Sequence, residues 1–163
     1  MEQVTLSTER LLLVPTTPEE ALAQIEALPA PQRAEVSPDW LGRARAATTA
    51  DPWLFGFNAR ARDTGALIGG CGFKGPPDAD GIVEITYGVD AAHQKRGYAT
   101  EAAQALIAFA FGSSFVRVVR AHTRTGNIAS ERVLEKCGFE RIGEVIEPED
   151  GLVWRWERAK QQS

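Results

Sequence analysis

Hydrophobic residues alternate with polar ones in several short stretches of this chain, whereas in two later stretches they recur at helical spacing. From Val83 to Val89 every second residue is apolar, which predicts a strand with one buried face. Between Gly97 and Phe111 small and apolar residues fall three or four positions apart, which predicts a helix. The predicted strands are Leu6–Pro15, Trp53–Ala61, Ala66–Phe73, Ile82–Val89, Val116–Thr123, Phe139–Glu147 and Leu152–Arg158, and the predicted helices are Pro18–Leu28, Pro38–Thr49, Gly97–Phe111 and Asn127–Cys137.

Turn signals join these elements into a mixed α/β order. Asp63-Thr64-Gly65 predicts a hairpin, Lys74–Gly81 predicts a loop, Asp150-Gly151 predicts a turn, and Lys160–Ser163 reads as a frayed tail. A strand–helix–strand crossover from Ile82 to Thr123 predicts one parallel pair within a largely antiparallel sheet. Ligands bind at the carboxyl ends of strands in open α/β sheets, so we expect a site there.

Length and composition fit one globular domain over residues 1–163, with 44% hydrophobic and 25% charged residues. The net charge of −4 argues against nucleic acid or an anionic membrane as the main partner. Cys71 and Cys137 lack metal-type spacing and are expected in the core, and His93 and His122 are too few to build a metal site. A signal-peptide pattern and an 18-residue apolar run are both missing, which favours a cytoplasmic protein.

A basic turn with a glycine lies between the strand Ile82–Val89 and the helix Gly97–Phe111. The first amides of a helix have no partner inside it, and the macrodipole places about +0.5 charge at this end. Gly97 lets a ligand approach the backbone, and Lys95 and Arg96 add positive charge, so the turn predicts a diphosphate site. The alternative is that Gly97 only opens the helix while the basic side chains are solvated. The turn matches neither the nucleoside-triphosphate loop nor the dinucleotide fingerprint.

The turn resembles the acyl-CoA pyrophosphate loop of the GNAT N-acetyltransferases, Gln/Arg-x-x-Gly-x-Gly/Ala, and its continuation is similar to the Rim-type branch, which acetylates N-termini of ribosomal proteins. A second segment, Asn127–Phe139, resembles the Asn-x-x-Ser…Glu-Lys-x-Gly-Phe element of the same branch. Asn127 is also a good N-cap, so a purely structural reading explains part of this match. The residues that carry the first match are Gln94, Lys95, Arg96, Gly97, Tyr98, Ala99 and Thr100.

The resemblance implies the GNAT fold: a central, mostly antiparallel twisted sheet that splays at a parallel strand pair, with helices on both faces. It also implies transfer of an acetyl group from acetyl-CoA to a primary amine of a protein N-terminus or a small molecule, without a metal. A non-catalytic acyl-CoA-binding or sensor module is the main alternative, and a binder of other phosphate ligands is a third. The protein would be a monomer or a homodimer. The resemblance assigns binding of acetyl-CoA to Tyr87, Val89, Gln94, Lys95, Arg96, Gly97, Tyr98, Ala99, Thr100, Asn127 and Ser130.

Glu84 is the candidate general base, because many relatives use a glutamate on this strand; the alternative is an ordinary polar residue of a half-exposed strand. The backbone N–H of Val89 is the candidate group for polarising the thioester carbonyl. Many relatives protonate the thiolate with a tyrosine whose position is occupied here by Leu134, so Ser130 is assigned to hydrogen-bond the sulfur. Gly88 stands where many relatives have an aromatic residue, and would widen the acceptor pocket or mark a bulge.

Four aromatic or imidazole side chains have no single assigned role. His122 lies where it would face the acceptor and receives no role. Trp40 is a candidate for lining the acceptor pocket. Trp154 and Trp156 share one face of the last strand, which would belong either to the core or to a dimer surface.

Overall fold

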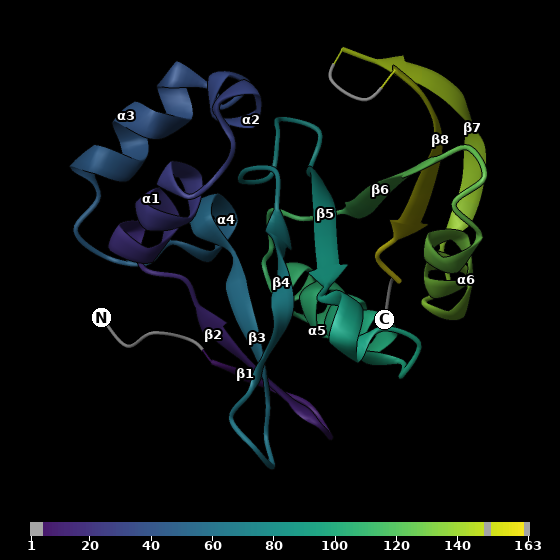
Figure 1. Cartoon of the computed structure of the whole chain (residues 1–163). Helices are drawn as coiled ribbons and strands as arrows, with labels where there is room; N and C mark the ends of the chain where they lie inside the picture. Colours follow the sequence, from purple (N-terminus) through teal and green to yellow (C-terminus); the bar gives the residue numbers. More distant parts are fainter. Residues whose placement is uncertain (1–4, 149–150, 162–163) are drawn as a thin grey trace.

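The computed structural model describes residues 5–148 and 151–161, and these build one eight-stranded sheet (Figure 1). Its strand order is β1-β2-β3-β4-β5-β6-β8-β7, and every neighbouring pair except β5 and β6 is antiparallel. The strands are β1 (Leu6–Ser7), β2 (Leu11–Pro15), β3 (Phe57–Ala61), β4 (Leu67–Phe73), β5 (Ile82–Val89), β6 (Val118–Arg124), β7 (Glu140–Glu147) and β8 (Gly151–Ala159). The mixed α/β class with one parallel pair is confirmed.

Six α-helices accompany the sheet in the described ranges. Figure 1 shows the first four grouped beside the N-terminal strands, while the last lies beside β7 and β8. Helix α5 packs against β2, β4 and β5 and contacts α6. The helices are α1 (Pro18–Glu26), α2 (Ala30–Ala34), α3 (Pro38–Ala46), α4 (Pro52–Phe55), α5 (Tyr98–Phe111) and α6 (Ile128–Lys136).

The parallel pairing of β5 with β6 is short. It covers three positions, of which the last joins Glu84 to Arg120. On its other side β5 stays paired with β4 as far as Val89. The carboxyl half of β5 therefore has a strand neighbour on one edge only, and the sheet divides there into β1–β5 and β6–β8–β7.

The core lies between the sheet and α5. Ala103, Leu106 and Ala110 of α5 are completely buried, as the helical spacing predicts. Trp156 is also in the core, with its Nε1 donating to Thr123 Oγ1 at 3.0 Å, and Trp154 packs against the same cluster. The last strand thus turns its tryptophans to the core.

Two predicted strands are wrong in part, each for a local reason. The strand predicted for Leu6–Pro15 is interrupted at residues 8–10, because Thr8 and Arg10 turn to bind a carboxylate of α5. The strand predicted for Trp53–Ala61 begins as the short helix α4, since Asp51 caps Trp53 N–H and Pro52 opens the turn.

The other boundaries differ by a few residues, and α2 was not predicted. Asp150 of the predicted turn and residues 162–163 of the predicted tail lie outside the described residues. Across the described ranges, no helix is both long enough and apolar enough to cross a membrane.

Candidate active site

The loop between β5 and α5 has the conformation of an anion-binding turn. Gln94 Nε2 donates to the carbonyl of Val89 at 2.9 Å and ties the loop to the end of β5. Lys95 and Gly97 both have positive φ, 65° and 82°, a left-handed conformation of the kind found in backbone nests that bind anions. Gly97 is the N-cap of α5 and supplies no capping side chain, so the first-turn amides of α5 depend on an external partner. The side chains of Lys95 and Arg96 are exposed beside them.

The sequence-predicted residues of this loop continue directly into α5. Tyr98, Ala99 and Thr100 form the first turn of α5 and are half-buried. The Arg10 guanidinium lies 4.5 Å from the centre of the Tyr98 ring, and its Nη2 would lie 3.2 Å from a Cβ added at Gly97. Arg10, which precedes β2 and is distant in sequence, therefore adds a third positive charge to those of Lys95 and Arg96 at this loop.

Glu101 in the same turn explains why Arg10 stays there. Its carboxylate accepts hydrogen bonds from Arg10 N at 2.8 Å, from Arg10 Nε at 2.9 Å and from the Thr8 hydroxyl. Burial alone would raise the pKa of Glu101, but these hydrogen bonds and the Arg10 charge outweigh it and lower the pKa. The turn between β1 and β2 is thereby fixed to the start of α5.

The backbone direction at Val89 follows from the register of β4 and β5. Asp90 N–H donates to the carbonyl of Ile68 at 2.8 Å, and Lys74 N–H donates to the carbonyl of Glu84 at 2.9 Å. In an antiparallel ladder the direction of N–H and C=O alternates along the strand, so every second residue between Glu84 and Asp90, including Val89, turns these groups to the other edge. Val89 therefore presents its N–H on the edge of β5 that β6 has left, where its carbonyl already accepts from Gln94.

A pair of hydroxyl groups spans the divergence between β5 and α6. The Tyr87 Oη lies 2.9 Å from the Ser130 Oγ, and Tyr87 is half-buried. Burial raises the pKa of Tyr87, although the hydrogen bond with Ser130 acts in the opposite direction. Asn127 Oδ1 accepts from Ser130 N at 3.2 Å, so Asn127 does cap α6. Leu134, where the resemblance places a tyrosine in many relatives, is completely buried in the core.

Glu84 lies on the opposite face of β5 in a group of charged side chains. Its Oε2 is 3.1 Å from Lys74 Nζ and 3.0 Å from His122 Nδ1. His122 Nε2 in turn accepts from Arg155 Nε at 3.1 Å and lies 3.4 Å from Glu147 Oε1. Sequence reasoning missed three members, Lys74, Glu147 and Arg155. The only sequence signal for them is a polar position in an alternating strand or beside one.

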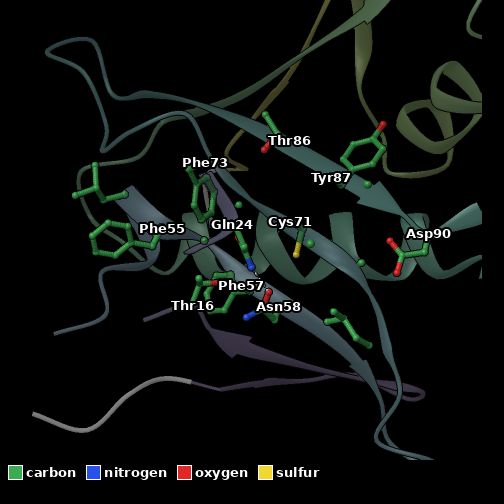
Figure 2. Close-up of a pocket in the computed structure, with 17 residues that line it drawn as sticks. Thr16, Gln24, Phe55, Phe57, Asn58, Cys71, Phe73, Thr86, Tyr87 and Asp90 are labelled. Atoms are coloured by element: carbon green, nitrogen blue, oxygen red, sulfur yellow. Dashed lines mark hydrogen bonds between the residues drawn. The ribbon is translucent and has the colours of Figure 1, made fainter. Parts of the chain in front are cut away.

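A cavity of about 520 Å³ lies on this face, between α1, α4 and the strands β3 to β5 (Figure 2). Phe55, Phe57 and Phe73 give it an aromatic wall. Asn58 gives it a polar one, with its Oδ1 accepting from Gln24 Nε2 at 3.3 Å.

The cavity reaches β5 at Thr86, Tyr87 and Gly88. A Cβ added at Gly88 would meet nothing within 4 Å, so glycine leaves room there without being required by the backbone. Trp40 is not among the lining residues. Its ring packs edge-on against the ring of Phe55, and Phe55 does line the cavity.

The two cysteines are free thiols, both buried. Cys71 lines the cavity, and burial raises the pKa of its thiol to about 12. Burial also raises the pKa of Cys137, to about 11. Both thiols are therefore protonated near neutral pH. Among the described residues, His, Cys, Asp and Glu side chains form no group of three suited to a metal ion.

Comparison with known proteins gives a family match over most of the chain. A family model described as an acetyltransferase (GNAT) domain matches residues 10–140. The uncharacterized N-acetyltransferase YjdG of Bacillus subtilis (strain 168) is 38% identical over 78 residues, which are 48% of this chain and 46% of that protein. The chain spans about half the length of the curated relatives that it matches.

Solved structures agree with the fold. The GNAT-family acetyltransferase from Bacillus anthracis superposes with a TM-score of 0.67 at 18% identity, over 96% of this chain and 98% of that one. RimL, a ribosomal L7/L12 alpha-N-protein acetyltransferase solved with coenzyme A, gives a TM-score of 0.69 at 16% identity, again over 96% and 98%. These similarities confirm the splayed, mixed sheet that the sequence resemblance implies.

Proposed function

The chain belongs to the GNAT acetyltransferase family, and we propose that it transfers the acetyl group of acetyl-CoA to a primary amine by direct transfer in a ternary complex. The observation that carries the proposal is the arrangement at the end of β5. There the open N-terminus of α5, the outward N–H of Val89 and the Tyr87–Ser130 hydroxyl pair lie along one edge that no strand covers.

The residues at this edge fit acetyl-CoA, which would supply the acetyl group as a thioester. The amides around Gly97 and the side chains of Lys95 and Arg96 suit the diphosphate. The uncovered edge of β5 offers backbone groups to the amides of pantetheine, in the manner of an added strand. The amide nitrogen of Asn127, which the α6 cap does not use, is a further donor for pantetheine.

In the proposed reaction the acceptor nitrogen forms a bond to the acetyl carbon while the carbon–sulfur bond breaks. Glu84 takes the proton that the amine loses, directly or through a water molecule. The Val89 N–H stabilises the charge that develops on the carbonyl oxygen, a contribution of about 3 kcal/mol for one preorganised donor. The departing sulfur receives a hydrogen bond from Ser130 and a proton from the Tyr87–Ser130 pair.

Tyr87 is protonated near neutral pH, as a tyrosine ordinarily is, and burial raises its pKa further. Tyr87 thus offers from β5 the phenol that α6 lacks at Leu134. Direct transfer is preferred to an acetyl-enzyme because Cys71, the cysteine among the cavity-lining residues, has a buried thiol that is held protonated and is therefore weakly nucleophilic.

We place the acceptor in the cavity beside Gly88, and the Rim-type resemblance favours a protein N-terminus or a small-molecule amine. An α-amine with a pKa of about 7.7–8.0 is neutral roughly a tenth of the time at pH 7, whereas a lysine near 10.4 is neutral well under a thousandth. A single carboxylate such as Glu84 is sufficient help for an α-amine.

The test combines calorimetric titration with an acetyl-transfer assay. Acetyl-CoA should bind in the micromolar range and 3′-phospho-ADP much more weakly. Wild-type protein should then acetylate members of a panel of peptide N-termini and small amines. Glu84→Gln should bind acetyl-CoA as wild type does and turn over about 10²–10⁴-fold more slowly. Tight binding without transfer to any amine would favour the non-catalytic acyl-CoA module, and no binding to folded protein would refute the proposal.

A further inference from the structure

His122 occupies a position on β6 where it touches the proposed base from one side and the C-terminal hairpin from the other. Its side chain is only 5% exposed, although it lies on the polar face of the sheet. Arg155 is its register partner on β8, and Glu84 lies on β5 across the diverging strand pair. The ring is therefore held between β5 and β8 at the point where the two halves of the sheet separate.

Arg155 determines which nitrogen of the ring carries the proton. A guanidinium has donors only and keeps its charge, so the 3.1 Å contact from Arg155 Nε requires a lone pair on His122 Nε2. Glu147 Oε1 lies 3.4 Å from the same nitrogen, and Arg155 Nη2 donates to it at 3.3 Å. Arg155 thus bridges the two acceptors. The contact from Arg155 assigns the ring proton to Nδ1.

The protonated nitrogen faces Glu84. Nδ1 lies 3.0 Å from Glu84 Oε2 and is buried, yet the angle is not that of a hydrogen bond, so this nitrogen has no hydrogen-bond partner in the described residues. An unsatisfied buried N–H is unfavourable, and a small turn of the Glu84 carboxylate would complete the bond. Lys74 Nζ contacts the same oxygen at 3.1 Å. Both contacts fall on Oε2, which leaves Oε1 as the oxygen that we assign to the acceptor.

We propose that His122 is a positioning residue for Glu84: its Nδ1–H holds Oε2, so that Oε1 faces the acceptor amine and takes its proton. Arg155 fixes the tautomer that makes this possible, and Lys74 contributes charge to the same oxygen. The inference rests on the proposed function in so far as Glu84 acts as the base. It adds that the hairpin of β7 and β8 contributes, through Arg155, to the geometry of the base.

Two near-isosteric substitutions separate the two ring nitrogens. Asparagine carries its amide nitrogen the same number of bonds from Cβ as imidazole Nδ1, and glutamine carries its own at the distance of Nε2. We expect His122→Asn to keep kcat within about threefold of wild type. His122→Gln should lower kcat by about ten- to hundredfold, the range for loss of a hydrogen bond to a charged group. The Kd for acetyl-CoA should be unchanged in both, and Glu144→Gln, on the exposed face of β7, serves as a control.

A second measurement needs neither turnover nor a variant. Long-range 1H–15N spectra of wild-type protein distinguish the two tautomers, and His122 should be protonated at Nδ1 and bare at Nε2. Equal losses in the two variants, a larger loss in His122→Asn, or a proton on Nε2 would overturn the proposal. If wild-type protein acetylated no amine, the proposed function would fail, and the tautomer would still decide whether His122 holds Glu84.

Discussion

Two glycines on adjacent strands beside the proposed site should respond in opposite ways to the same substitution. A Cβ added at Gly69 of β4 would lie 2.1 Å from the backbone oxygen of Gly88 on β5, and 3.0 Å from two further backbone atoms. A Cβ added at Gly88 would meet nothing within 4 Å. Neither glycine is among those with positive φ, so available space and not backbone strain decides each outcome.

The magnitude for Gly69→Ala follows from these contacts. The obstructing atoms are backbone, so relief requires the two strands to separate by more than 1 Å, which breaks ladder hydrogen bonds around Gly88. Overpacking of this kind costs about 1–3 kcal/mol. For a chain of 163 residues, about 2 kcal/mol corresponds to a fall in Tm of about 4–8 °C. Gly88→Ala should change Tm by less than about 2 °C, because an alanine that fits without strain is neutral or slightly stabilising.

Thermal unfolding monitored by circular dichroism measures the Tm of both alanine variants, and calorimetric titration with acetyl-CoA measures their affinity for the cofactor. Gly69→Ala should also weaken acetyl-CoA binding, because it displaces the strand end that carries Val89. A bulky Gly88→Phe should keep Tm and acetyl-CoA affinity while reducing turnover of large acceptors. Equal Tm values for the two alanine variants, or a greater loss for Gly88→Ala, would refute the reasoning.

Three further predictions concern the hydroxyl pair and the start of α5. Tyr87→Phe and Ser130→Ala should each lower kcat, and the double variant should lose less than the sum of the two free-energy effects, because the hydroxyls act as one unit; additive effects in the kinetic cycle would contradict this. Gly97→Ala should weaken acetyl-CoA binding about tenfold or more, whereas Gly65→Ala, with a similar φ of 74° in a distant turn, should lose only stability. Glu101→Gln should lower the free energy of unfolding by about 1–3 kcal/mol at pH 7. Because the folded-state pKa of Glu101 is lowered, that difference should be complete above the unfolded pKa of about 4.3 and should disappear as the pH falls through the lowered pKa, as thermal unfolding at several pH values would show.

Local sequence patterns predicted much of this fold, because the strands and helices concerned are determined by residues that are close together in the sequence. Alternation in β5, helical spacing in α5 and the glycine at the α5 N-cap are each confirmed. The prediction that a strand begins at Trp53 was wrong, because the pattern of apolar residues does not take account of Asp51 and Pro52. These two residues cap and open the short helix α4. The break in the first predicted strand depends on Glu101, more than ninety residues away, and no local pattern contains it.

The candidate site divides in the same way. The loop Gln94–Gly97 and the helix start at Asn127 are contiguous motifs, so the sequence could predict a role for them. Glu84 contacts Lys74 and His122, and His122 in turn contacts Glu147 and Arg155; these four residues come from four different strands or their ends, where each is one polar residue among others. The Tyr87–Ser130 contact joins residues 43 positions apart and depends on how β5 and α6 approach each other.

The three-residue pairing of β5 with β6 has a consequence for how the protein unfolds. Two blocks of sheet are joined there by a few backbone bonds, so opening between them is expected to cost less than global unfolding of the free protein. A ligand bound along β5 would contact both blocks and stabilise the closed sheet. By thermodynamic linkage this stabilisation grows with ligand concentration and reaches about 2.7 kcal/mol at a hundredfold excess over Kd. Amide hydrogen exchange at the ends of β5 and β6 should slow when acetyl-CoA is added. The survival of this protein against proteolysis in a cell would then follow the supply of its own substrate.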